Sequence, residues 1–126
     1  MDVLSQAKES GVIRAHGVSC HTLPALKLAA ATPWVDVDLA RINPDGILMD
    51  SDPATVIGIL KQMKASGKGV IGMKILGEGK FKTREKQRES LKFVLALGCV
   101  DAFCIGFESP KQIDEICDLI SEVLNA

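Results

Sequence analysis

The stretch that decides the fold is Gly69–Phe81, which reads GVIGMKILGEGKF. Its first half is a short apolar run, typical of a buried parallel strand. The run then breaks at Gly77, Glu78 and Gly79, which Lys80 follows. Two glycines beside a lysine, just before a helix, offer backbone N–H groups and a positive charge to an anion. The same spacing also fits a plain turn, so the loop alone leaves both interpretations open.

Length and composition favour a single domain over residues 1–126 with its own hydrophobic core. Hydrophobic residues make up 47% of the chain, and the net charge is −1 without a basic block. This balance argues against nucleic-acid or membrane partners. No apolar run approaches the roughly 20 residues that span a bilayer, and the N-terminus lacks a signal-peptide core. We therefore expect a cytoplasmic protein.

The four cysteines form no Cys-x-x-Cys pair and are typical of reduced thiols in a cytosolic protein. They are Cys20, Cys99, Cys104 and Cys117. With two histidines and no ligand cluster, no metal site is expected. Cys20, in a loop, is the one thiol that could be reactive, although a small packing residue fits there too.

Apolar runs alternate with amphipathic segments along the chain. A first helix ends near Ser10, and strands are expected over 12–18, 35–40, 70–74 and 102–105. Helices are expected over 23–31, 54–65, from Thr83 to before Gly98, and from Pro110, with caps at Thr22, Asp52 and Ser109. Apolar residues of the last helix form an inner face that comprises Ile113, Ile116, Leu119, Ile120, Val123 and Leu124. Four strand–helix units imply a parallel α/β sheet, either doubly wound or half of an eight-stranded barrel.

Four segments of the chain resemble the second half of aldo-keto reductases. They are Gly11–His21 (GVIRAHGVSCH), Val35–Val37 with Asn43-Pro44, Gly69–Gly79, and Ile105–Ile113, similar to the fifth to eighth strands and their exits. The resemblance covers essentially the whole chain in order. It implies the (βα)4 half of a TIM barrel with parallel strands and an extra N-terminal helix, because a whole barrel needs roughly 200 to 250 residues.

The resemblance also implies a nicotinamide cofactor, NADP or NAD, and places its contacts. Ser19 and Cys20 would face the nicotinamide, Leu76, Gly77 and Gly79 the pyrophosphate, Ser109 and Gln112 the adenosine ribose, and Glu115 the adenine. Several family residues are replaced: Cys20 stands for an asparagine, Leu39 for a glutamine, Gln112 for an arginine and Ile116 for an asparagine. These departures leave no preference between NADP and NAD.

The family's general acid is a tyrosine, and this sequence contains none. A proton donor must reach the carbonyl oxygen of a substrate. His21 and Lys74 are the candidate catalytic residues at the mouth of the half barrel. A solvated loop histidine and a lysine paired with a neighbouring carboxylate are the simpler interpretations. The predicted function is NAD(P)H binding with weak reduction of a small carbonyl. The alternative is a non-catalytic oligomeric half-barrel scaffold.

Charged side chains of the second strand are further candidates for a functional role. Asp36 and Asp38 lie two residues apart and could form a carboxylate pair or bind a metal. The simpler expectation is that Asp38 points into the barrel interior or to solvent. Arg41, at the end of this strand, would face the mouth or solvent.

Four barrel strands leave two open edges and an uncovered inner face. Such surfaces favour association, so we expect a homodimer. Two copies would close a pseudo-barrel or pack face to face. Alternatively, the sheet would flatten under the N-terminal helix.

Overall fold

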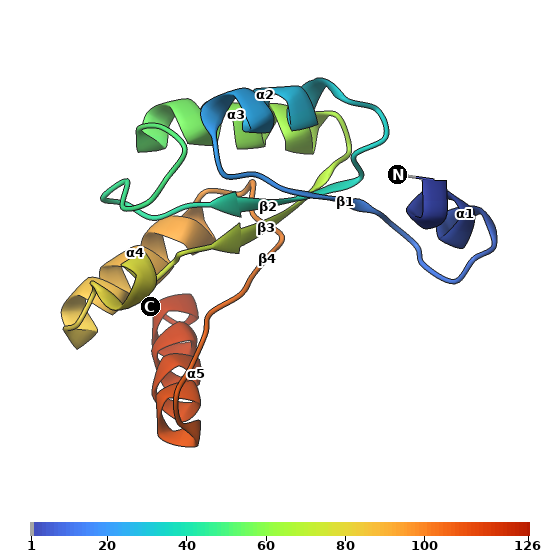
Figure 1. Ribbon diagram of the computed structural model, residues 1–126. Coiled ribbons are helices and arrows are strands. Elements are labelled where there is room, and N and C mark those ends of the chain that lie inside the picture. Colours follow the sequence, from blue (N-terminus) through green and yellow to red (C-terminus); the bar gives the residue numbers. More distant parts are fainter. Residues whose placement is uncertain (1) are drawn as a thin grey trace.

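A computed structural model describes residues 2–126 of the chain (Figure 1). Helices and strands alternate along this part of the sequence. Their bounds are α1 Asp2–Glu9, β1 Gly17–Ser19, α2 Leu23–Ala31, β2 Val37–Arg41, α3 Pro53–Ala65, β3 Gly69–Met73, the 3-10 turn η1 Gly77–Gly79, α4 Arg84–Ala96, β4 Ala102–Phe103 and α5 Pro110–Leu124.

The strands form one sheet in the order β1-β2-β3-β4, and every neighbouring pair is parallel. In Figure 1, α2 and α3 lie together on one side of the sheet, and α4 and α5 follow its curve toward the C-terminus. Consecutive parallel strands with helices on one face are the arrangement of half a TIM barrel. The predicted fold is therefore confirmed, and the doubly wound alternative is excluded because its strand order would be permuted.

Local chemistry fixes the starts of the helices as predicted. The side-chain oxygens of Thr22, Asp52 and Ser109 accept backbone hydrogen bonds from the residue three positions on. A proline follows each cap within the first turn, where its missing N–H costs nothing. Thr83 caps α4 in the same way.

The two outer strands are shorter than predicted. β1 begins only at Gly17 and β4 ends at Phe103, because each has a single neighbour to pair with. The extra helix α1 is present, but it contacts the amino end of the sheet rather than covering its inner face. Lys8 donates to Asp36 at 2.6 Å, while Val3 of the same helix remains 79% exposed.

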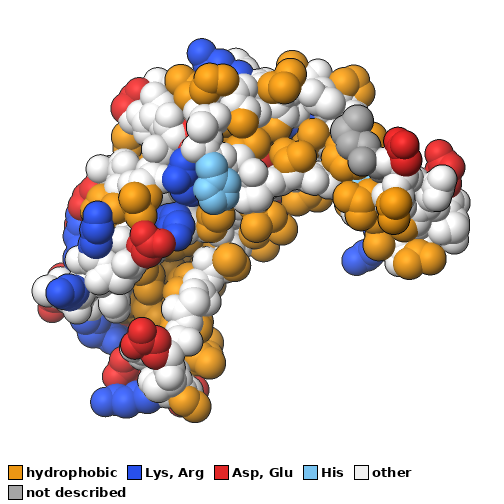
Figure 2. Space-filling model, viewed as in Figure 1, with side chains coloured by type: hydrophobic (Ala, Val, Ile, Leu, Met, Phe, Trp, Pro, Cys, Tyr) orange, Lys and Arg blue, Asp and Glu red, His pale blue; other side chains and the backbone are white. Residues whose placement is uncertain are grey.

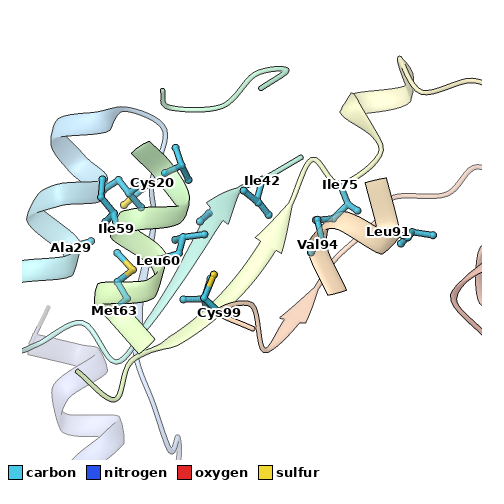
Figure 3. Close-up of a cluster of buried hydrophobic side chains, with 14 of the residues drawn as sticks. Cys20, Ala29, Ile42, Ile59, Leu60, Met63, Ile75, Leu91, Val94 and Cys99 are labelled. Atoms are coloured by element: carbon cyan, nitrogen blue, oxygen red, sulfur yellow. The ribbon is translucent and has the colours of Figure 1, made fainter. Parts of the chain in front are cut away.

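The hydrophobic core fills the space between the sheet and its helices (Figure 3). Its largest fully buried side chains include Leu26, Ile42, Leu60, Met63, Ile75, Leu91 and Leu119. Residues of β2 and β3 that alternate with buried ones are only half-buried, namely Val37, Leu39, Ile71 and Met73. These belong to the inner face, and Figure 2 shows hydrophobic side chains along the concave side of the molecule.

Two predictions of side-chain position are wrong. Asp38 is completely buried and faces the helices, because it shares the buried face of the sheet with its neighbours Ala40 and Val70. In α5, Ile113 and Leu124 are 44% and 66% exposed although both were placed on the inner face. No neighbouring element covers these two positions of the helix.

Candidate functional site

A cleft of about 890 Å³ opens between the loop after β3 and the start of α5. Parallel strands of a barrel gather their exit loops at the carboxyl edge of the sheet, where ligands bind. Five of the predicted site residues line this cleft, namely Lys74, Leu76, Gly79, Gln112 and Glu115. The fold thus brings together residues from two separate segments of the resemblance.

The glycine loop after β3 has a geometry that requires glycine. Gly77 and Gly79 have φ values of +59° and +77°. A Cβ atom on Gly77 would lie 3.1 Å from the buried ring of Phe81. The amide of Gly77 donates to the carbonyl of Lys74 at 2.9 Å, which closes the loop tightly. The ring of Phe81 therefore packs against Gly77 and supports the glycine turn.

Lys74 is paired with a carboxylate, as the simpler interpretation of this residue expected. Its Nζ atom lies 2.5 Å from Oε1 of Glu78, and both side chains line the cleft. The pKa of Glu78 is lowered, chiefly by the hydrogen bond from Lys74 and further by Lys80 and Arg41. Glu78 is thus paired with Lys74, and the lysine–glutamate spacing of four residues was its only signal in the sequence.

The start of α5 forms the other wall of the cleft through Gln112, whereas its N-cap Ser109 does not line the cleft. Oγ of Ser109 accepts from the amide of Gln112 at 3.4 Å, and Oε1 of Gln112 accepts from the amide of Glu108 at 2.8 Å. Both oxygens thus serve the helix start. The Ser109 hydroxyl and the Gln112 side-chain NH₂ are the groups left to donate to a ligand.

The exit of β1 forms a second part of the same edge. Oγ of Ser19 and Nε2 of His21 are 3.2 Å apart, and both residues are exposed. The guanidinium of Arg41 donates to the carbonyl of His21 at 2.7 Å and forms an ion pair with Asp50. Because the Asp50 side chain is only 1% exposed, it anchors Arg41 and, through it, the β1 exit. No local pattern marks Asp50 in the sequence.

Cys20 lies under this edge with its side chain in the core. It is 3% exposed, and its pKa is raised to about 12 by burial and by Asp38. The thiol is therefore protonated at neutral pH, which fits the small packing residue expected as one alternative and not the reactive thiol. The backbone amide of Cys20 donates to Leu39 at 3.2 Å, so the residue continues the pairing of β1 with β2.

Residues 2–126 lack the features of two other kinds of site. Within that range, no three His, Cys, Asp or Glu side chains gather closely enough to hold a metal ion. In the same part of the chain, no helix has the length and apolar character needed to cross a bilayer. All four cysteines are free.

Comparison with known proteins defines the class of fold. The sequence matches no protein family profile, and no curated protein matches it significantly. Among solved structures it is similar to a protein from Pseudomonas aeruginosa assigned to the aldo-keto reductases, with a TM-score of 0.73 and 20% identity. The match covers 96% of this chain and 42% of that chain. The chain thus has the fold of part of such a barrel and spans less than half the length of that protein.

Proposed function

We propose that the carboxyl edge of this half barrel binds a nicotinamide dinucleotide, NADH or NADPH. The observation that supports the proposal best is the cleft of about 890 Å³ between the glycine loop of β3 and the start of α5. Its volume suits an extended small molecule, and its place in the fold is where barrel enzymes bind their ligands. The similarity of this chain to the fold of a protein assigned to the aldo-keto reductases adds support.

In this proposal each part of the cofactor meets a different segment. The nicotinamide lies near Ser19 and the backbone of Cys20, at the exit of β1. The pyrophosphate lies beside Leu76, Gly77 and Gly79. The adenosine lies against α5, with Ser109 and Gln112 near the ribose and Glu115 near the adenine.

Helix α5 contains no arginine that could bind a 2′-phosphate on the ribose. The neighbouring cation, Lys111, lies 3.6 Å from Glu115, which partly neutralises it. A lysine is also a poorer fork for phosphate than an arginine. We therefore propose that the chain binds NADH and NADPH with similar affinity.

A bound reduced nicotinamide supplies a hydride for reduction of a small carbonyl. This chain's part is to deliver a proton to the carbonyl oxygen, and His21 and Lys74 are the groups that could do so. The hydroxyl of Ser19 orients the His21 ring, and Arg41 holds its backbone. Lys74 shares its charge with Glu78. With no tyrosine in these 126 residues, the proposed activity is weak.

Isothermal titration calorimetry with NADH and NADPH tests the binding proposal. Trp34 is a poor reporter because it stacks on His16 at the amino end of the sheet, with ring centroids 4.0 Å apart. We expect Gln112→Ala to weaken binding about fivefold, the value of one hydrogen bond. Gln62→Ala, at an exposed position of α3, is the matched control and should bind as the natural chain does. Absence of saturable binding of both cofactors at millimolar concentration would refute the proposal.

A second candidate function is a non-catalytic, self-associating half barrel. The half-exposed inner face and the open edges of β1 and β4 favour it. We propose a homodimer, whose mass by light scattering is twice 13.5 kDa. A monodisperse monomer at high concentration would contradict this. Steady NADPH-dependent turnover of a generic aldehyde, lost in His21→Asn, would overturn the non-catalytic alternative.

The place of the protein in the cell follows from the same proposal. Cytoplasmic pools contain both nicotinamide cofactors, and four free thiols suit a reducing compartment. Fractionation of the cells that produce the chain tests this proposal. Recovery of the chain outside the cytoplasm would contradict it.

A further inference from the structure

Two charged residues of the loop after β3 adopt a backbone conformation that side chains rarely take. Lys74 and Glu78 have φ values of +61° and +55°. Left-handed backbone at a non-glycine residue is strained, and such residues cluster at ligand sites. Here both strained residues stand on one short loop that lines the cleft.

Buried contacts from the loop after β2 hold Lys74 in this conformation. Asn43 is fully buried, and its Nδ2 atom donates to the carbonyl of Lys74 at 3.3 Å and to that of Ile47 at 2.8 Å. The amide of Ile47 donates back to Oδ1 of Asn43 at 3.0 Å. These hydrogen bonds join the loop after β2 to the loop after β3 and so fix the backbone of Lys74.

Glu78 is far less constrained than its partner. Its side chain is 55% exposed, against 29% for Lys74, and it stands between Gly77 and Gly79. A Cβ atom on Gly79 would meet nothing within 4 Å, so there is open space beside the turn. An ion pair this exposed contributes little to stability, so its glutamate can leave at little cost.

We propose that the Glu78 carboxylate occupies the position of a ligand phosphoryl group and acts as an internal counter-ion that such a group displaces from Lys74. The inference rests on the proposed function, because the anion in question is the pyrophosphate of the dinucleotide. The pyrophosphate bridge carries two negative charges and more acceptor oxygens than one carboxylate, so it competes well for the same ammonium. Lys74 is then a binding residue, and Glu78 lowers the affinity for anions.

Glu78→Gln tests this exchange directly. The amide keeps the shape of the side chain but removes the competing charge, so NADPH and inorganic pyrophosphate should each bind about fivefold more tightly. Lys74→Met should weaken both by a similar factor. In the double variant Lys74→Met/Glu78→Gln, removal of the carboxylate should bring no gain, because its partner is already absent.

Glu108→Gln is the matched control, since Glu108 lines the same cleft and also carries one negative charge but is not paired with Lys74. An equal gain in Glu108→Gln would mean that only net charge matters, and it would overturn the proposal. If the natural chain binds NADPH but Glu78→Gln binds it no better, the exchange is refuted while the cofactor proposal stands. If neither form binds NADPH but both bind pyrophosphate with the expected difference, the cofactor proposal fails and the exchange stands. No binding of pyrophosphate by either form refutes the exchange.

Discussion

The two ends of the sheet are built on different principles. At the amino end, the rings of His16 and Trp34 stack at 4.0 Å with an angle of 11°. The carboxylate of Asp36 accepts from Lys8 and from the amide of His16. These contacts tie α1 to the first two strands.

At the carboxyl end, charge and strained backbone take the place of packing. The three non-glycine residues with positive φ in the described range, Leu48, Lys74 and Glu78, all lie in loops that leave this end. Arg41 and Lys74 each form an ion pair there. The difference teaches that the amino end ties α1 to the sheet, whereas the carboxyl end leaves charged groups at the edge where the proposed ligand would bind.

The largest expected effect comes from Gly17, where β1 starts. A Cβ atom at this position would lie 1.7 Å from the carbonyl oxygen of Val37. Gly17→Ala should therefore force β1 away from β2 and cost about 3 kcal/mol or more. Urea denaturation measures this loss. Gly106→Ala is the control at the carboxyl end, because its new Cβ meets nothing within 4 Å. Equal stability of both variants would break the comparison.

Asp50 is a carboxylate at the carboxyl end of the sheet that should stabilise the fold. Removal of its charge leaves Arg41, whose side chain is 16% exposed, without an anionic partner. Asp50→Asn should cost about 2 kcal/mol and loosen the loop that carries His21. Thermal melts and NMR of the His21 ring would measure the two effects. Asp114→Asn, at an exposed position of α5, should change neither.

Replacement of Asp38, in the middle of β2, should stabilise the fold, whereas replacement of Asp50 destabilises it. Both its oxygens are buried without a hydrogen-bond partner among the described residues. Burial raises the pKa of Asp38, and the nearby Cys20 thiol opposes that rise only in part. Ionisation therefore destabilises the fold as the pH rises from 3.8 through the raised pKa. Asp38→Asn should raise the melting temperature by about 4 °C at pH 8. The gain should shrink at pH 4, and a gain independent of pH would contradict this explanation.

The smallest expected effect concerns Asp36 at the amino end. The hydrogen bond from Lys8, followed by that from the His16 amide, lowers the pKa of Asp36 below its usual 3.8. Its contribution is complete above about pH 4 and is lost as the pH falls through the lowered pKa. Asp36→Asn should detach α1 and change Trp34 fluorescence at neutral pH, with little change in the midpoint of global unfolding. The same fluorescence change should occur in the natural chain only in acid. Identical fluorescence of the two proteins at pH 7 would show that α1 is held otherwise.

Much of the fold was predictable because its signals are local. Thr22, Asp52 and Ser109 cap their helices through atoms three residues away, and glycine follows the helix ends wherever the backbone turns left-handed. The strands were harder. Residues 12–16 have the composition of a strand, but the amides of Val12 and Ile13 donate to the carbonyl of Ala7 at the end of α1 instead of pairing with β2, so β1 begins late.

The candidate site was predictable only in part. Gly79 and Gln112 were expected at one site because the resemblance aligned them, and Lys74 because it ends a strand at the same mouth. All three line one cleft. Which face of β2 holds Asp38 could not be predicted, since alternation defines two faces without saying which one the helices cover. The role of Asp50 depends on a loop whose path no local spacing encodes.

The sequence by itself determined the order and type of the elements and the glycine turn after β3, because capping, periodicity and positive φ depend on near neighbours. Only the tertiary structure decided that Lys74 and Glu78 line one cleft with α5, that Arg41 joins the exits of β1 and β2, and that Asp38 is buried. These facts depend on how parallel strands bring distant loops to one edge, and charge and burial act through space rather than along the chain.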